Sequence, residues 1–167
     1  KTKQISFVFL GDGATEEGVF YESVNFAILK KLPVIFVCEN NLYSVYSPLT
    51  VRQPKNRDLT KMCTSLGIKS LKCDGNDAIK SYKTFSKVIN KIRSNQEPYF
   101  IEFETYRWLE HCGPNFDNNL KYRSKKEFLN WQKKDPLKVL SMKLSKNRIK
   151  EFSKIKKKIK KEIDLAF

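Results

Sequence analysis

The sequence predicts an α/β protein, with a mostly parallel sheet layered between helices and a helical tail at the C-terminal end. Short apolar runs alternate along the chain with helical patterns, and turn residues follow the apolar runs. Of the 167 residues, 40% are hydrophobic and 13% are aromatic, which is typical of a globular domain with a core. We find no run of about 18 apolar residues that could span a membrane.

Four apolar segments are expected to be strands. The expected strands are residues 5–10, 34–38, 68–73 and 99–105. The first two are almost continuously apolar, which favours strands that are buried on both faces, as in a parallel sheet. The expected helices between them are residues 16–30, 59–66 and 77–92. The first strand, helix and second strand form a βαβ unit, whose crossover should be right-handed.

The helix expected at about residues 16–30 has recognisable ends. Thr15 is the expected N-cap, and the carboxylates of Glu16 and Glu17 suit the positive start of a helix. Pro33 ends it. Its expected apolar face consists of Val19, Phe20, Val24, Phe26, Ala27 and Leu29.

The C-terminal third differs in character. We expect residues 1–107 to be the α/β domain, 108–137 a loop and connector, and 138–167 a basic amphipathic helix of the same domain. Eleven Lys and Arg against three Asp and Glu in 138–167 account for much of the net charge of +15. We expect these lysines to form a solvated face. An acidic partner subunit, a membrane surface and nucleic acid are the alternative partners that the charge leaves open.

The four cysteines are Cys38, Cys63, Cys73 and Cys112. None of them forms a C-x-x-C pair, and His111 is the one histidine, so the spacing of a zinc finger is absent. Reduced thiols are the simplest interpretation, and they predict a cytoplasmic protein.

Two residues with oxygen-bearing side chains follow the first two expected strands. Asp12 comes just after the first strand, and Asn41 just after the second. Because the carboxyl ends of parallel strands meet at one edge of the sheet, we expect both to face one ligand. Carboxylate and amide oxygens suit Mg²⁺, which commonly takes further oxygens from phosphates. Gly11, Gly13 and Ala14 would let the backbone and a helix start approach a diphosphate.

Several motifs in order resemble one family. They are Gly-Asp-Gly-Ala at 11–14, Glu-Asn-Asn-Leu-Tyr at 39–43, Asp-Gly-Asn-Asp at 74–77, Glu-Thr-Tyr-Arg at 104–107, Tyr-Arg at 122–123 and Asp-Pro at 135–136. The first two are similar to the thiamine diphosphate motif. Together they resemble the alpha subunit of the decarboxylating component of 2-oxo acid and acetoin dehydrogenase complexes, over most of the chain.

The resemblance implies roles for particular residues. Asp12 and Asn41 would ligate Mg²⁺ through their side chains, and Tyr43 through its carbonyl oxygen. Gly11, Gly13 and Ala14 would contact the diphosphate of the cofactor. Arg107 would lie near the cofactor and order the active-site loop or the phosphates.

The loop after Thr105 departs from the family pattern. His111 would be the catalytic residue, as a proton donor near the reacting carbonyl, or would only bind phosphate and order the loop. Cys112 stands where the family usually has a serine. The changed loop favours, as an alternative, a transketolase-like or sugar-pathway thiamine diphosphate enzyme. A basic nucleic-acid-binding or scaffold domain is the non-enzyme alternative.

The resemblance also implies partners. We expect a beta subunit in an alpha2beta2 assembly, a lipoyl transacylase, and a small 2-oxo acid or acetoin-like substrate. We also expect the chain to be a C-terminal fragment, because the family's alpha subunit has a long segment before the first strand.

Overall fold

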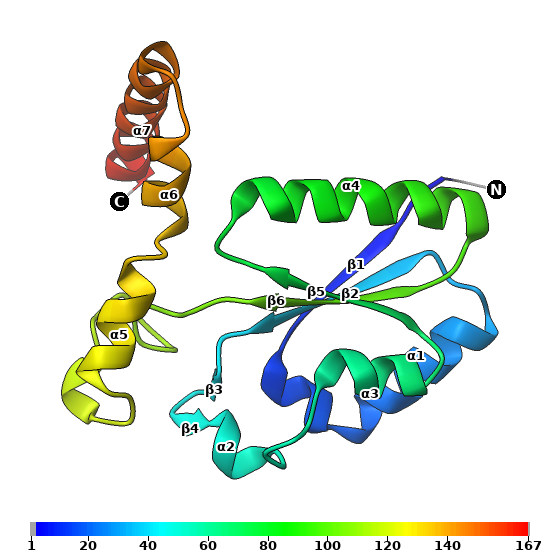
Figure 1. The fold of residues 1–167 in the computed structure, drawn as a ribbon. Helices are drawn as coiled ribbons and strands as arrows, with labels where there is room; N and C mark the ends of the chain where they lie inside the picture. The colour runs from blue at the N-terminus through cyan, green and yellow to red at the C-terminus, as the bar shows by residue number, and fades with distance from the viewer. Residues whose placement is uncertain (1–2, 167) are drawn as a thin grey trace.

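The computed structural model describes residues 3–166, whose centre is a four-stranded parallel sheet (Figure 1). The strands are β1 (Ser6–Gly11), β2 (Val34–Asn40), β5 (Lys69–Asp74) and β6 (Tyr99–Glu104). They lie in the order β1-β2-β6-β5. The predicted α/β class and all four predicted strands are confirmed, with ends within two residues of those expected.

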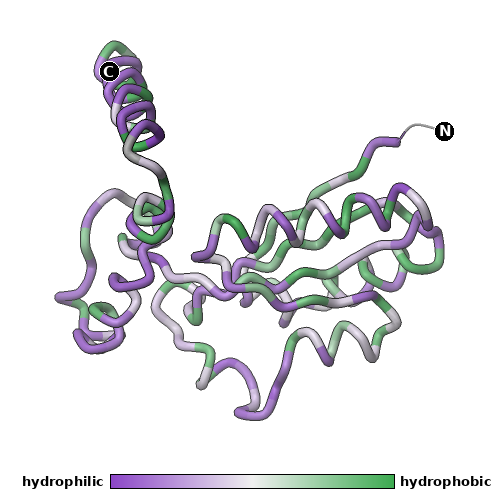
Figure 2. The backbone as a smooth tube through the Cα atoms, turned by 45° about the horizontal axis from the view of Figure 1, so that its top comes forward, coloured by the Kyte–Doolittle hydropathy of each residue, from purple (hydrophilic) through white to green (hydrophobic). Residues whose placement is uncertain are grey.

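Helices cover both faces of the sheet. α4 (Ala78–Asn95) lies on one face, and α1 (Gly18–Leu29) and α3 (Leu59–Ser65) lie on the other (Figure 1). Successive side chains of β2 alternate between the two resulting cores. Phe36 packs with the residues of α1 and α3, and Val37 with those of α4. β2 is therefore buried on both faces, as its apolar run predicts, and Figure 2 shows hydrophobic residues along the central strands.

β1 contradicts the same prediction. It forms an edge of the sheet, and the exposed fractions of Phe7, Val8 and Phe9 are 42%, 41% and 64%. The apolar run correctly predicts a strand. It does not show whether that strand lies in the centre or, as among the described residues, at the edge of the sheet.

The start of α1 also differs from the prediction. A 3₁₀ turn, η1 (Asp12–Glu16), follows β1, and α1 begins at Gly18. Thr15 is not the N-cap, because its buried hydroxyl donates to the carbonyl oxygen of Asp12 at 2.6 Å. Glu17 occupies the cap position without a side-chain hydrogen bond.

Half of the apolar face expected on α1 is buried. Phe20, Val24 and Ala27 lie in the core. Val19, Phe26 and Leu29 are exposed by 66%, 53% and 71%. These three side chains leave an apolar surface on α1.

A small substructure that the sequence does not predict connects β2 to α3. It consists of β3 (Tyr43–Ser44), β4 (Ser47–Pro48) and α2 (Leu49–Arg52). β3 and β4 pair antiparallel, and the amide of Leu49 donates to the carbonyl of Leu42 at 2.8 Å. These contacts fold the segment back beside η1.

The segment after β6 contains more helix than predicted. The expected loop and connector at 108–137 contains a 3₁₀ turn, η2 (Asn118–Leu120), followed by α5 (Lys125–Gln132). The tail helix expected from residue 138 is two helices, α6 (Pro136–Met142) and α7 (Lys146–Ala166). Asp135 caps α6 by accepting from the amide of Leu137 at 2.9 Å.

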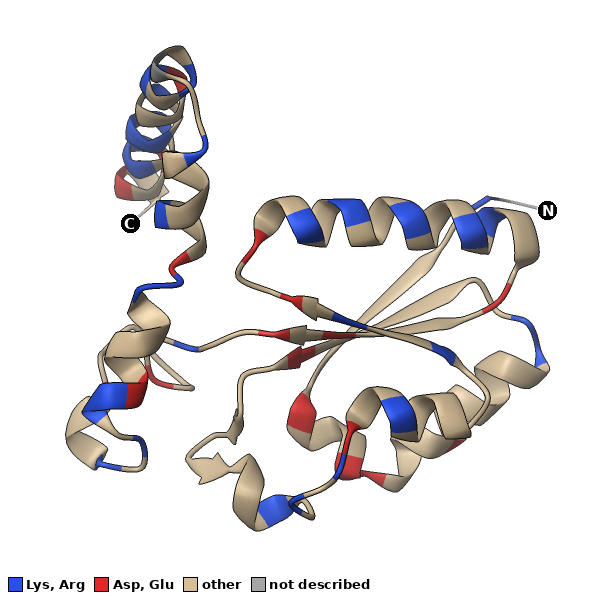
Figure 3. Ribbon diagram, viewed as in Figure 1, with Lys and Arg blue, Asp and Glu red and all other residues tan. Residues whose placement is uncertain are grey.

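α6 and α7 lie apart from the sheet (Figure 1), and the basic residues of α7 are spread along its exposed surface (Figure 3). The lysines of α7 whose side chains the structure describes are exposed, and so are the apolar residues of this helix. Between residues 3 and 166, no helix combines the length and apolar character needed to cross a membrane.

Candidate functional site

The candidate site lies where β1 and β2 end. The two strands are parallel, and Gly11 pairs with Glu39 across them. Asp12 follows β1 directly, and Asn41 follows β2 directly. The register therefore places the two turns at the same edge of the sheet, as the sequence predicts, and Figure 3 shows acidic residues at several strand ends there.

Asp12 is buried, with an exposed fraction of 1%. Its carboxylate oxygen Oδ2 forms an ion pair with the guanidinium of Arg52, the last residue of α2. Arg52 also pairs with Glu16, and Gln53 donates to Glu16 at 2.8 Å. The turn η1 and the segment that ends α2 are thus joined by a polar cluster.

Gly13 lies close to side chains of β3 and α2. A Cβ atom on Gly13 would lie 3.0 Å from the Oγ atom of Ser44 and 3.4 Å from a nitrogen of Arg52. A Cβ atom on Gly11 would meet nothing within 4 Å. The missing side chain of Gly13 therefore lets η1 pack closely against Ser44 of β3 and Arg52 of α2.

The turn after β2 is stabilised by hydrogen bonds to the side chains of its two asparagines. The side-chain oxygen of Asn40 accepts from the amide of Leu42 at 3.1 Å, and that of Asn41 accepts from the amide of Tyr43 at 3.0 Å. Leu42 has a φ of 73°, in the left-handed region that is costly for a leucine. Such strain persists only where the surrounding structure enforces it. The amide oxygen of Asn41 keeps a second lone pair for another partner.

Tyr43 connects this turn to α5. Its hydroxyl donates to the carboxylate of Glu127 at 2.9 Å. Burial, followed by this hydrogen bond, raises the pKa of the Tyr43 phenol above its ordinary value. The phenol therefore remains a neutral donor. Tyr43 is thus fixed through its backbone amide, which donates to Asn41, and through its hydroxyl, which donates to Glu127 of α5.

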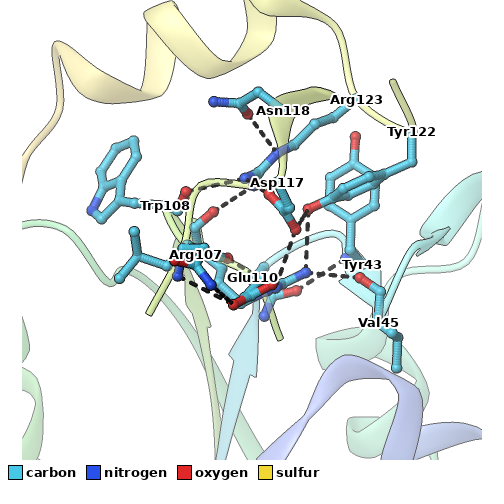
Figure 4. A network of polar contacts seen from close by, with 12 residues as sticks. Tyr43, Val45, Arg107, Trp108, Glu110, Asp117, Asn118, Tyr122 and Arg123 are labelled. Atoms are coloured by element: carbon cyan, nitrogen blue, oxygen red, sulfur yellow. Dashed lines mark hydrogen bonds and ion pairs between the residues drawn. The ribbon is translucent and has the colours of Figure 1, made fainter. Parts of the chain in front are cut away.

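Arg107, which follows β6, orders the connector (Figure 4). Its guanidinium donates to the carbonyl oxygens of Val45 at 2.8 Å and Leu109 at 2.9 Å, and to the hydroxyl of Tyr122 at 3.3 Å. These partners lie on the β3–β4 turn and on the connector, so Arg107 ties the two segments together.

A second arginine lies deeper in the same network. The side chains of Arg123 and Asp117 are exposed by 1% and 2%, and they form an ion pair. Arg123 also donates to the carbonyl oxygens of Arg107 at 2.5 Å and Trp108 at 3.1 Å. The hydroxyl of Tyr122 donates to Asp117 at 2.8 Å. This buried pair joins Arg107 and Trp108 to residues 117–123 and so closes the segment that carries His111.

His111 itself is exposed, as is the neighbouring Cys112. Among the described residues, no hydrogen bond or ion pair joins the imidazole of His111 to Asp12 or Asn41. The structure thus brings together the turns of Asp12 and Asn41–Tyr43, and it leaves His111 at the surface of the connector.

The sequence did not single out Arg52, Ser44 or Asp117. Arg52 is 40 positions from Asp12, and no local pattern links the two residues. Glu102 had a usable signal, because it is a charged residue within an apolar strand. It is 3% exposed and accepts from the side-chain nitrogen Nδ2 of Asn40 at 2.8 Å.

The donor set at the two turns is rich in hard oxygens. It comprises the carboxylate of Asp12, the amide oxygen of Asn41 and the carbonyl oxygen of Tyr43, which suit a hard divalent cation. Within residues 3–166, no three His, Cys, Asp or Glu side chains are grouped so that they could hold a metal ion. This donor set contains one carboxylate, and a cation held by it would need further ligands from elsewhere.

Fold and site define a parallel α/β protein with a glycine-containing turn beside oxygen donors. The chain belongs to the dehydrogenase E1 component family, whose model matches residues 1–167. It is 36% identical over 167 residues to the pyruvate dehydrogenase E1 component subunit alpha of Rickettsia felis, covering 96% of this chain and 50% of that protein. The corresponding Staphylococcus aureus subunit is 34% identical over 133 residues, covering 80% of this chain and 35% of its own length.

The chain spans about half the length, or less, of these curated relatives. Among solved structures, a transketolase from Leishmania mexicana is similar, with a TM-score of 0.48 and 16% identity, over 60% of this chain and 15% of that one.

Proposed function

We propose that this chain is the part of an E1 alpha subunit that holds thiamine diphosphate through Mg²⁺, in an enzyme that oxidatively decarboxylates a 2-oxo acid or cleaves an acetoin-like compound. The observation that carries the proposal is the pairing of two turns at one sheet edge. A buried carboxylate and a closely packed glycine follow β1, and an asparagine turn with a left-handed Leu42 follows β2.

The residues present fit this group. Asp12 and Asn41 would hold the cation through side-chain oxygens, and Tyr43 through its carbonyl oxygen. Gly11, Gly13 and Ala14 would face the diphosphate, whose oxygens would supply the ligands that the chain lacks. When bound, thiamine diphosphate supplies the carbon nucleophile and the electron sink of the reaction.

The connector would carry the chain's own contribution to the chemistry. We propose that His111 donates a proton near the reacting carbonyl once the connector closes over the substrate. The contacts of Arg107 with Val45 and Leu109 support a role in ordering that connector. The imidazole would then be positioned by a rigid support, although His111 itself is exposed.

Partners and compartment follow from the same proposal. The matched relatives are named as alpha subunits of an E1 component, which supports a beta subunit as partner of the whole protein, in an alpha2beta2 assembly. A lipoyl transacylase would accept the product. The reduced cysteines that the sequence suggests support the cytoplasm as the compartment.

Calorimetry of thiamine diphosphate with Mg²⁺, on the full-length protein with its beta partner, tests the clamp. We expect Asp12→Ala together with Asn41→Ala to abolish binding. Asp58→Ala, which removes the N-cap of α3 away from the site, is the control and should bind normally. Binding that survives the double substitution would show that another site holds the cofactor.

The glycine of the turn allows a sharper test. Gly13→Ala brings a methyl group to 3.0 Å from Ser44, whereas Gly18→Ala meets nothing within 4 Å. We expect the first to weaken binding of the cofactor by about tenfold or more and the second to leave it unchanged. Equal affinities for the two variants would argue against a diphosphate at Gly13.

Single-turnover decarboxylation measures the role of His111. We expect His111→Ala to slow this step by about a hundredfold, the lower end for general acid catalysis, without changing cofactor affinity. An unchanged rate would reject proton donation by His111.

A further inference from the structure

Arg52 stands out because every nitrogen of its guanidinium is engaged beside the proposed site. Nε donates to the carbonyl oxygen of Ser47 at 3.1 Å, one terminal nitrogen pairs with Glu16 and the other with Asp12. Its side chain is exposed by 13%. Such a fork cannot rotate without losing partners, so its orientation is fixed.

The arrangement determines which oxygen of Asp12 is occupied. Arg52 binds Oδ2, and this leaves Oδ1 as the oxygen for a cation. Asp12 is 1% exposed, so water provides little of the stabilisation that its negative charge needs. Within the described residues, Arg52 is the cation that forms an ion pair with this carboxylate.

The guanidinium also lies close to Gly13 of η1, the turn proposed to face the diphosphate. One of its nitrogens is 3.4 Å from the position that a Cβ atom of Gly13 would take. Asp12 and Glu16 bring two negative charges to this turn, and a diphosphate would bring more. A fixed positive charge at this point lowers the repulsion that an incoming anion meets.

We propose that Arg52 is a positioning residue of the metal–diphosphate site. It holds Asp12 with one oxygen presented to the cation, and it supplies positive charge beside the diphosphate. The inference rests on the proposed function, and it adds a residue outside the strand-end motifs. Ligand-orienting neighbours of this kind contribute substantially to metal affinity.

Arg57 provides a matched control. It is an arginine five residues further along, and it also reaches η1, where it donates to the carbonyl oxygen of Thr15 at 3.1 Å. It donates to the hydroxyl of Tyr21 as well, at 2.6 Å. Arg57 thus fastens the same segment to the same turn without binding Asp12. If Arg52 only fastens α2 to the domain, Arg52→Gln and Arg57→Gln should behave alike.

The test is the binding of Mn²⁺ to the full-length protein with its beta partner, followed by electron paramagnetic resonance at saturating thiamine diphosphate. Thermal unfolding of the cofactor-free proteins is recorded in parallel. We expect Arg52→Gln to weaken Mn²⁺ binding about tenfold to a hundredfold, and Arg57→Gln less than about threefold. Arg52→Lys keeps the charge but not the fork, and it should fall between Arg52→Gln and the wild type.

Each outcome decides the proposal. Equal losses in the two glutamine variants, or no loss in Arg52→Gln, would overturn it. Tighter Mn²⁺ binding by Arg52→Gln would also overturn it, because Arg52 would then compete with the cation. If Arg52→Gln does not fold, the affinity of Arg52→Lys decides. A wild-type protein that binds neither Mn²⁺ nor thiamine diphosphate would instead refute the proposed function itself.

Discussion

Replacing Arg123 by methionine should release the connector without unfolding the sheet. The substitution keeps much of the side-chain volume but leaves the carboxylate of Asp117 buried, at 2% exposure, without its closest cation. Removing one partner of a buried ion pair costs about 3–5 kcal/mol. Two backbone carbonyls, those of Arg107 and Trp108, lose their donor as well. We therefore expect a loss of about 4 kcal/mol in the local stability of the connector.

Native-state hydrogen exchange followed by mass spectrometry measures this loss locally. Since about 1.4 kcal/mol corresponds to a factor of ten, amides opening with the connector should exchange about a thousandfold faster. The amides of Glu110 and Leu120 are reporters, because they donate to Asn115 at 2.8 Å and Asp117 at 3.0 Å within the connector. Amides of β6 should keep their protection.

The control is Arg148→Met, which removes an exposed ion pair with Glu151 on α7. Such a pair contributes less than about 1 kcal/mol, so exchange in the connector should not change. Adding Asp117→Leu to Arg123→Met should restore part of the protection, because it removes the buried carboxylate, whose remaining ion-pair partner among the described residues is Arg107 at 3.7 Å. Wild-type exchange rates between residues 107 and 123 in Arg123→Met would refute the argument that this pair holds the connector.

Three further changes are predicted. Burial raises the pKa of Glu102, so the folded state binds this proton more tightly and loses stability as the pH rises above the ordinary value of 4.5. In urea unfolding, Glu102→Gln should therefore have a higher free energy of unfolding than the wild type near pH 7, and this difference should vanish near pH 4. Lys31 follows α1 with a φ of 48°, so Lys31→Gly should raise the free energy of unfolding by about 1 kcal/mol, whereas Lys30→Gly, at a φ of −90°, should lower it. Cys112 is exposed, whereas burial raises the pKa of Cys63 to about 12, so a thiol reagent should label one cysteine rapidly and Cys112→Ser should remove that phase.

The strands and their end turns could be predicted because their signals are local. Continuous apolar runs such as that of β2, ended by polar residues, are properties of a few neighbouring positions. The same locality explains the placement of Asp12 and Asn41, since parallel strands bring their carboxyl ends to one edge.

Contacts between distant positions could not be predicted. Nothing near Asp12 in the sequence indicates Arg52, and nothing near Val45 indicates Arg107, 62 positions away. The left-handed Leu42 was also hidden, because leucine itself disfavours that conformation and only the surrounding hydrogen bonds enforce it. The prediction of a single helix from residue 138 was wrong, because the apolar pattern of the sequence does not show the interruption between α6 and α7.

The edge position of β1 affects the tendency of residues 3–166 to self-associate when this stretch is studied alone. Within this stretch β1 pairs with β2 on one side, and its other side presents backbone donors and acceptors beside Phe9, which is 64% exposed. An apolar strand edge of this kind is a template onto which strands of other molecules can add, and natural proteins normally shield it. Concentrated preparations of this stretch should therefore self-associate through β1, and a lysine at position 8 should reduce that tendency.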